Sequence, residues 1–448
     1  MVRRTFFATV LAIGSLCAQQ LQQPQLPVEH SSNETGLDTD GPGRGVARIS
    51  LVNGDVSLRR GDSSELITAT QNTPVMVGDT VVTNAQSRAE LQLDHSNMLR
   101  IGAMAQLKVS ELEFRRYMLQ LTSGTVTFRV LRNSDAQVEL GTPSVAIRPV
   151  HKGIYRVTVR QDGTSEITVR LGTLEVYTPR GTEQLHPGQT MLARGGQNDA
   201  EFQVLNAPYE DEWDRWNLSR DAQLEHSSAY QYVSPEVYGA EDLDGQGQWV
   251  NNSSYGQVWS PNATSTDWAP YRNGRWVWED YYGWTWVSYD SWGWAPYHYG
   301  RWFWDTSYGW CWWPGARGAH HYWRPALVGF FGFGSGYGSI GWVPLAPYEP
   351  FHPWWGVGIY GGYRNGFNGG GFGASVNLMA VYRNARYEHA VTGIAVGQFG
   401  RGPVNAQTMT RVTRGDLMNS GMVRGALPVS PDRSSLHVVD RPPRAACR

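Results

Sequence analysis

Lysine, cysteine and long apolar runs are scarce in this sequence, and each scarcity excludes a class of protein. Only Lys108 and Lys152 among the 38 basic residues are lysines, and neither stands in a phosphate-binding or Ser-x-x-Lys pattern. Charged residues make up 17% of the 448 residues and the net charge is −2, so no basic field predicts nucleic-acid binding. No uncharged apolar run reaches the roughly 18 residues of a membrane span. The length predicts two or three folded units.

The N-terminal residues 1–18 have the pattern of a secretory signal. Two arginines precede an apolar run that ends in small residues, so we expect the mature protein to begin near Gln19 in the periplasm or outside the cell. Lipidation of Cys17 is an alternative, which the bulky leucine before it disfavours. Cleavage leaves Cys311 and Cys447, one disulfide at most, so disulfides do not form the framework of the fold.

Short alternating runs follow a flexible linker. Residues 19–44 are polar and rich in Gln, Pro and Gly, which predicts the linker. Between residues 45 and 195, apolar and polar residues alternate in short runs, which predicts an all-β domain of stacked hairpins. The expected turns are Asn53-Gly54, Ser123-Gly124 and Asp162-Gly163, and a further hairpin joins Leu91/Leu93 to Leu99/Ile101.

Motifs recur in a fixed order along this β domain. They are Asn53-Gly54-Asp55-Val56, Val77-Gly78-Asp79, Ser87-Arg88-Ala89-Glu90-Leu91, Gly141-Thr142-Pro143, Asp162-Gly163 and Pro187-Gly188-Gln189. In this order they resemble a FecR-type domain, with Asp94-His95-Ser96 where the family has an Asp-Gly-Ser turn. The resemblance implies an all-β domain and, as an alternative function, an envelope signalling or regulatory module.

Residues 196–240 are expected to hold a linker and one connector helix. The helix is predicted over residues 206–226, because Pro208 suits a first turn and three acidic residues follow it at the positive end of the helix dipole. Trp213, Trp216 and Leu224 fall on one face, so we expect this helix to pack against a neighbouring domain.

Eighteen of the 20 tryptophans lie between Trp249 and Trp355. The pattern Gly-x-Trp-x5-Tyr-Gly-x-x-Trp occurs three times there, starting at Gly247, Gly274 and Gly300. Three copies at nearly constant spacing predict a repeated β-hairpin domain over residues 241–355, arranged as a solenoid or partial propeller. One face of each hairpin is aromatic, and the other carries residues such as Arg275, Val277, Glu279 and Thr285, so we expect that face to be polar.

Two phrases of the Trp-rich segment, Tyr-Gly-Trp-Thr-Trp-Val-Ser-Tyr (282–289) and Trp-Gly-Trp-Ala-Pro-Tyr-His-Tyr-Gly-Arg-Trp (292–302), resemble secreted proteins of unknown activity in which a FecR-type domain precedes a Trp-rich region. The resemblance implies this architecture and an exported location. The rings either fill the hairpin cores or form a ligand platform. The candidate platform residues are Arg275, Trp276, Trp278, Trp284, Trp286, Arg301, Trp302, Trp304, Trp310 and Trp312.

Residues 356–448 begin with a Gly-rich segment and continue as a basic tail. Residues 374–448 carry ten arginines against four acidic residues and few aromatics. This composition predicts a partly disordered, flexible tail with at most a strand or two near 376–382 and 391–396.

The sequence predicts no catalytic residue, no metal and no cofactor. His298, His320, His321 and His352 match no metal spacing, and the Gly-x-Gly-x-x-Gly matches lie outside any strand–helix context. Glu279, Asp280, Asp290 and Asp305 are interpreted as surface charges. We therefore predict a non-enzymatic, exported envelope protein that binds or scaffolds a cell-envelope glycan or another envelope protein. A FecR-like signalling module is the alternative, and a glycan hydrolase is third.

Overall fold

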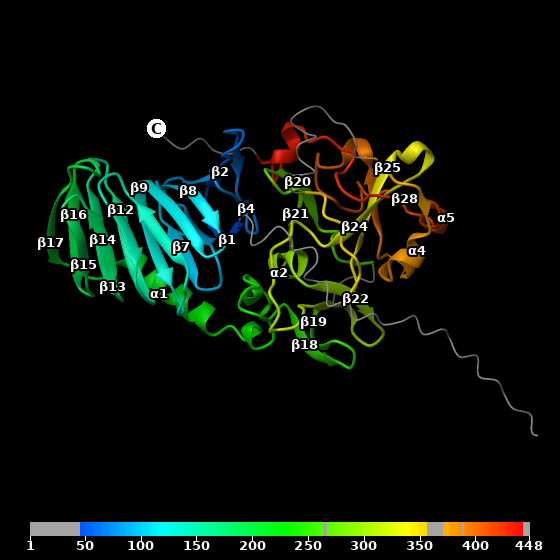
Figure 1. The fold of residues 1–448 in the computed structure, drawn as a ribbon, viewed down its shortest axis with the longest axis horizontal. Coiled ribbons are helices and arrows are strands. Elements are labelled where there is room, and N and C mark those ends of the chain that lie inside the picture. The colour runs from blue at the N-terminus through cyan, green and yellow to red at the C-terminus, as the bar shows by residue number, and fades with distance from the viewer. Residues whose placement is uncertain (1–44, 263–266, 356–370, 388, 442–448) are drawn as a thin grey trace, which may run out of the picture. The chain divides into compact units, whose positions relative to one another are not determined.

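The computed structural model describes residues 45–262, 267–355, 371–387 and 389–441 (Figure 1). The fold is all-β, as predicted, with few and short helices. The predicted signal peptide, the 19–44 linker, Cys17, Cys447 and most of the Gly-rich segment fall outside the described residues. None of the helices in the described ranges combines the length and hydropathy of a membrane span.

Two sheets enclose one apolar core in the N-terminal sandwich, which we define as residues 45–206. Neighbouring strands follow the order β4–β1–β6–β7–β9–β12–β13–β16–β17 in sheet A and β3–β2–β5–β8–β9–β10–β11–β14–β15 in sheet B. The strands are β1 (Ala47–Asn53), β2 (Val56–Arg59), β3 (Leu66–Thr68), β4 (Pro74–Val75), β5 (Thr80–Thr83), β6 (Arg88–Gln92), β7 (Asn97–Ile101), β8 (Gln106–Glu113), β9 (Arg116–Val130), β10 (Gln137–Gly141), β11 (Ala146–Pro149), β12 (Gly153–Val159), β13 (Ser165–Leu171), β14 (Leu174–Thr178), β15 (Gly181–Leu185), β16 (Gln189–Arg194) and β17 (Glu201–Asn206).

Strand β9 belongs to both sheets. Its first half pairs with β8 and β10 in sheet B, and its second half pairs with β7 and β12 in sheet A. Gly124 marks the crossing, with φ +82° and a position where a Cβ would lie 2.5 Å from Ala105 Cα. Only glycine fits both that conformation and that approach. The prediction of a hairpin turn at Ser123-Gly124 was therefore wrong, because the chain continues as one strand.

The other expected turns have two outcomes. Asp162-Gly163 joins the paired strands β12 and β13, and β6 pairs with β7, so both hairpins are confirmed. Asn53-Gly54 instead carries the chain from β1 in sheet A to β2 in sheet B, and these two strands are not partners. Alternation alone does not distinguish a hairpin from a crossing between layers, since both need the same turn residues.

The sandwich continues beyond residue 195 into the segment expected to be a linker. Strand β17 pairs along its whole length with β16. Helix α1 (Glu212–Glu225) follows, shorter than predicted, with Asp211 as its N-cap and a capping box to Asp214. Of the predicted apolar face only Leu224 is buried, whereas the other buried helix residues are polar: Asp214, Asn217 and Asp221.

The three Trp repeats each form the predicted hairpin, but they do not form one array. Strands β18 (Gly247–Asn252) and β19 (Gly256–Pro261) join β22 (Arg301–Asp305) and β23 (Gly309–Trp313) in one four-stranded sheet. The middle pair, β20 (Gly274–Glu279) and β21 (Gly283–Ser288), is a separate sheet. The expectation of a solenoid or propeller was therefore wrong, because the repeats pack around a shared core instead of stacking.

The C-terminal segment is more ordered than its composition predicts. A five-stranded sheet has the order β26–β28–β24–β25–β27, so it combines two strands of the Trp-rich domain with three from the predicted tail. These strands are β24 (Val328–Phe333), β25 (Ser339–Pro344), β26 (Ser375–Val376), β27 (Thr392–Ala395) and β28 (Ser420–Met422). The described parts of the tail are thus folded, because apolar residues such as Ile394 and Met422 complete the core of the Trp-rich domain.

Short helices connect these strands. They are η1 (Ala229–Gln231), η2 (Ala240–Leu243), α2 (Trp294–His298), η3 (Ser335–Tyr337), α4 (Leu378–Val381), η4 (Asn384–Arg386), η5 (Val396–Gln398), α5 (Arg414–Met418) and η6 (Arg433–Leu436).

Candidate functional site

The residues predicted to form a ligand platform lie mostly inside the protein. Seven of the ten are buried: Arg275, Trp276, Trp284, Trp286, Trp302, Trp310 and Trp312. Trp278 and Arg301 are half-buried, and only Trp304 is exposed, at 38%. Because a buried ring offers no face to a sugar, the structure does not bring these residues together as a binding surface.

The buried rings form the core of the Trp-rich domain. Trp276 lies opposite Trp286 across the β20–β21 hairpin, and its ring centroid is 4.9 Å from that of Phe330 and 5.6 Å from that of Phe399. The hairpin is thus covered by β24 and by the C-terminal segment. Trp302 Nε1 donates to the carbonyl oxygen of Pro296 at 2.8 Å, so the polar edge of that ring is also satisfied inside the protein. Of the two alternatives left open by the sequence, the core packing holds for these rings.

The two arginines at equivalent repeat positions have different surroundings. Arg275 is fully buried, and its Nη1 lies 2.9 Å from Asp440 Oδ1. Arg301 donates from Nη1 to the carbonyl oxygen of Gly300 at 2.9 Å. A ligand surface repeated at hairpin spacing needs equivalent arginines in equivalent places, and the structure does not provide them.

The exposed Trp304 has a neighbour that the sequence analysis did not single out. The ring centroid of Tyr387 lies 6.1 Å away, and the two rings are inclined by 33°. Tyr387 is 42% exposed. These two rings form a small accessible aromatic surface at the edge of the Trp-rich domain.

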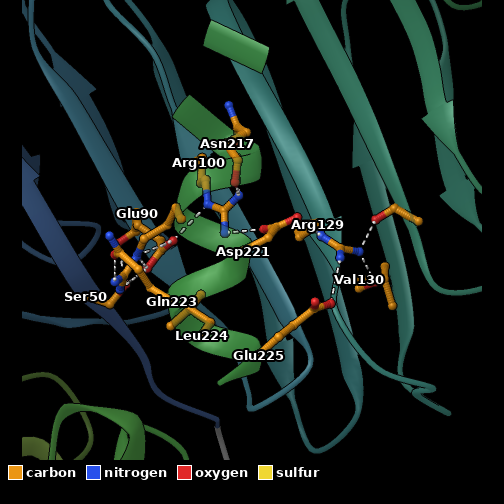
Figure 2. A network of polar contacts seen from close by, with 12 residues as sticks. Ser50, Glu90, Arg100, Arg129, Val130, Asn217, Asp221, Gln223, Leu224 and Glu225 are labelled. Carbon is orange, nitrogen blue, oxygen red and sulfur yellow. Dashed lines mark hydrogen bonds and ion pairs between the residues drawn. The ribbon is translucent and has the colours of Figure 1, made fainter. Parts of the chain in front are cut away.

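Helix α1 docks on the outer face of sheet A through charges (Figure 2). Asp221 lies between two arginines of the sheet: Arg100 Nη2 is 2.6 Å from its Oδ1, and Arg129 Nε is 2.5 Å from its Oδ2. Glu90 of β6 forms two ion pairs: its Oε2 lies 2.9 Å from Arg100 Nε, and its Oε1 lies 2.9 Å from Nη2 of Arg220 in the helix. All of these side chains except Arg220 are buried, so the helix is held by a network of alternating charges.

The electrostatics of this network fix the ionisation of Glu90. Burial by itself raises the pKa of its carboxyl, but the guanidinium groups of Arg220 and Arg100 lower it to about 2. Glu90 is therefore ionised at any physiological pH, and the network keeps its ion pairs.

A second set of buried charges joins the sandwich to the segment before the Trp repeats. Arg48 of β1 forms ion pairs with Glu241 at 3.1 Å and with Asp242. Burial raises the pKa of Asp242 to about 6; Arg48 opposes this effect and the charge of Glu241 adds to it. Tyr238 also donates its hydroxyl hydrogen to the carbonyl oxygen of Val46.

The hairpin face that was expected to be polar and exposed packs against the sandwich. Glu279 is buried and forms an ion pair with Arg60, which also lies 3.3 Å from Asp79. Val277 and Val287 belong to the apolar core of the sandwich. The prediction of a surface charge at Glu279 was wrong, since its partner lies 219 positions earlier in the chain.

Residues 432–441, here called the C-terminal strap, cross this joint. Val438 is fully buried in the sandwich core. Arg433 Nη2 lies 2.9 Å from Glu65 Oε1, and Thr68 donates from its hydroxyl to the carbonyl oxygen of Arg441 at 2.8 Å. The strap therefore ties the end of the described chain to strand β3 and to the loop before it.

Three other residues with reactive or titratable side chains, His298, Cys311 and Asp290, are buried or hydrogen-bonded to neighbours within the fold. His298 is buried, its Nδ1 lies 2.7 Å from the carbonyl oxygen of Arg324, and burial lowers its pKa to about 3. Cys311 is buried, and burial raises the pKa of its thiol to about 12. Asp290 accepts hydrogen bonds from Asn273 and Tyr297. Within the described ranges, no three His, Cys, Asp or Glu side chains are grouped as metal ligands would be.

Two family models match this chain, one within the N-terminal sandwich and one over the Trp hairpins. The family described as "FecR protein" matches residues 79–175, which span β5 to the start of β14. The family described as "Family of unknown function (DUF6600)" matches residues 240–349, which include all three Trp hairpins. The chain carries a FecR domain and a DUF6600 domain. The resemblance to FecR-type domains is thereby confirmed, and no curated protein matches the sequence significantly.

Solved structures add little to the family matches. Two crystal structures described as a "putative anti-sigma factor" from Parabacteroides distasonis ATCC 8503 align with this chain. The first, at 2.50 Å resolution, has 19% identity and a TM-score of 0.25, and the alignment covers 28% of this chain and 59% of that chain. The second, at 1.65 Å, has 14% identity and a TM-score of 0.27, with 39% and 95% covered. Values this low establish neither a shared activity nor a shared partner.

The arginines through which the sandwich contacts α1 and η2 carried no clear signal in the sequence. Arg48, Arg100 and Arg129 each occupy a polar position of an alternating strand, which predicts exposure to water. Their burial depends on α1 and η2, which lie far away in the sequence. The one available signal was the unusual density of arginine on the outward positions of sheet A.

Proposed function

We propose that this chain is an exported, non-enzymatic regulatory module of the cell envelope that acts by binding another envelope protein. The observation that carries the proposal is the FecR domain at residues 79–175. The sandwich that contains this domain is joined to the DUF6600 domain, and this attachment supports the proposal. Arg60–Glu279 and Arg48–Asp242 are buried ion pairs across the joint, and such pairs hold two domains in one arrangement.

Burial of the tryptophans favours a protein partner over a glycan. A glycan-binding array needs several accessible rings, whereas most of the candidate rings are in the core. The arginine-rich surfaces of the described tail supply charge without flat apolar platforms, and such surfaces recognise the carboxylates of proteins.

Glycan binding remains the second candidate, on one specific observation. Trp304 and Tyr387 form an exposed aromatic pair. If this pair binds sugar rings, insoluble peptidoglycan should retain the purified protein, and Trp304→Ala should abolish retention without changing the melting temperature. Equal retention of the wild type and the variant would exclude this site.

Gene deletion and complementation in the native host test the regulatory proposal. The transcript profile of the deletion strain should differ from that of the wild type under envelope stress, and the full chain should restore it. A copy without residues 2–18 should stay in the cytoplasm and fail to restore the profile. Unchanged transcripts, or restoration by the copy without residues 2–18, would contradict the proposal.

Export itself has a direct measurement. The mature protein should be recovered outside the cytoplasm with Gln19 at or near its N-terminus, by N-terminal sequencing or intact mass. A retained first residue or a lipid-modified Cys17 would contradict this cleavage.

A further inference from the structure

A groove of about 1140 Å³ lies at the edge of the five-stranded sheet, between η4, β27 and α5. Its apolar lining is mainly part-buried and aliphatic, with the exposed ring of Tyr387 beside it; the aliphatic side chains are Met379, Val391, Met409, Val412 and Leu417. Backbone bonds across the groove, such as Thr410 N to the carbonyl oxygen of Gly393 at 2.8 Å, fix its floor. The groove is therefore a built, recessed and mainly aliphatic surface.

Arginines surround this aliphatic floor. Arg272 belongs to the wall, since it donates to the carbonyl oxygens of Asp267 and Val391 at 2.9 Å each. Arg411 and Arg414 are exposed and form no hydrogen bond or ion pair with any residue that the structure describes. Arg386 is also exposed and uses its Nε to donate to the carbonyl oxygen of Met379 at 2.7 Å, which leaves its outer nitrogens for a ligand.

Two acidic side chains are described beside the groove, against four arginines in its lining. Asp416 caps α5, where its Oδ2 accepts from the backbone N of Thr413 at 2.9 Å. Asp267 lies 3.5 Å from His389 Nε2. The rim therefore presents an excess of positive charge above an apolar floor, and the complementary ligand is negatively charged with apolar side groups.

We propose that this groove binds an acidic, apolar peptide segment of a partner protein. The inference rests on the proposed function and names the contact through which the module recognises its partner. Leucine-like side chains enter the aliphatic floor, while carboxylates pair with Arg411, Arg414 and Arg386, which favour paired hydrogen bonds to carboxylate. Met379 and Met409 adapt their shape to different apolar side chains.

Other anionic ligands fit the groove less well. A membrane surface requires apolar side chains that protrude, whereas this floor is recessed. A glycan requires several aromatic faces, whereas the groove has one exposed aromatic ring, Tyr387, among mainly aliphatic side chains. The three arginines come from two segments, Arg386 from η4 and Arg411 and Arg414 from just before and at the start of α5, so a peptide that carries several carboxylates satisfies more of them than a single headgroup does.

Peptide binding to the purified full-length protein tests the inference. The probe is a fluorescein-labelled peptide of alternating Glu, Asp and Leu, measured by anisotropy. The double variant Arg411→Glu/Arg414→Glu should bind it about tenfold or more weakly than the wild type, and binding should weaken as salt rises. The matched control is Arg59→Glu/Arg424→Glu, which changes the net charge equally at exposed arginines outside the groove. It should bind within about twofold of the wild type.

Three results would overturn the inference. In the first, both double variants weaken peptide binding equally. In the second, a peptide with Lys in place of Glu and Asp binds as tightly as the acidic peptide. In the third, a peptide with Ser in place of Leu binds as tightly as the original peptide. Binding of the protein to phosphatidylglycerol vesicles or to peptidoglycan that is tighter than its binding to the peptide would also exclude the peptide as the ligand of this groove. Complementation that survives Arg411→Glu/Arg414→Glu would reject the groove and leave the regulatory function standing, so the two failures are distinguishable.

Discussion

Asp221 is the residue on which the docking of α1 depends, and its replacement by asparagine gives a quantitative test. Asp221→Asn keeps the size of the side chain and removes the charge that Arg100 and Arg129 share. Removing one partner of a buried ion pair costs about 3–5 kcal/mol, because the remaining charge stays in a medium that solvates it poorly.

The structure places the expected cost at the lower end of that range. Arg100 keeps Glu90 at 2.9 Å and the carbonyl oxygen of Asn217 at 2.8 Å. Arg129 keeps the carbonyl oxygens of Val130 and Gly153, at 2.7 and 3.0 Å. With these partners left, we expect a loss of about 3 kcal/mol, which is about a hundredfold in the equilibrium between docked and undocked helix.

Native-state hydrogen exchange measures this equilibrium locally, so the many tryptophans of the chain do not interfere. Amides of α1 should exchange about a hundredfold faster in Asp221→Asn than in the wild type. The control is Glu225→Gln, one turn further on, whose side chain is 42% exposed and which should accelerate exchange less than about fivefold. If both variants exchange alike, the helix is not held by the buried charges and the reasoning fails.

Three further predictions follow from burial. Trp276→Ala should lower the free energy of unfolding by about 3–5 kcal/mol in urea titrations, whereas Trp304→Ala should lower it by less than about 1 kcal/mol; similar losses would mean that the core is misassigned. Cys311 should react with iodoacetamide only in denaturant, because it is buried and its pKa is raised to about 12; labelling of Cys311 in the native protein, located by peptide mass, would contradict this. The pKa of Glu90 is lowered from 4.5 to about 2, so its contribution of about 3 kcal/mol is present above pH 4.5 and is lost as the pH falls towards 2. Acid titration of Glu90→Gln should lack this component, and a curve unchanged from the wild type would refute it.

Local pattern predicted the elements that depend on near neighbours. The alternation in each Trp repeat predicted the hairpins, and the structure pairs Trp249 with Trp259, Trp276 with Trp286 and Trp302 with Trp312. In each case the two strands are joined by a short turn, so register and face follow from the sequence between them.

Local sequence pattern could not predict the contacts between segments that are far apart in the chain. Glu279 has the appearance of a surface charge because nothing within its hairpin neutralises it, and its partner Arg60 lies in another domain. The same holds for the tryptophans: whether Trp276 is core or platform depends on Phe330 and Phe399, and no periodicity within residues 241–355 reveals Phe399. The burial of the Trp276 ring could not be predicted for this reason, since part of its cover comes from the segment expected to be disordered.

The C-terminal strap also determines how late in translation the joint between the sandwich and the β20–β21 hairpin is completed. Thr68 and Arg441, which the strap brings together, are 373 positions apart. At about 5–20 residues per second, a ribosome takes on the order of 20–75 s to pass from one to the other. During that interval the sandwich strands and then the β20–β21 hairpin exist without Val438, and Val277 and Val287 await the segment that seals them. Chaperones that bind nascent chains therefore have a long time in which to bind this incomplete joint, and slower translation lengthens that time.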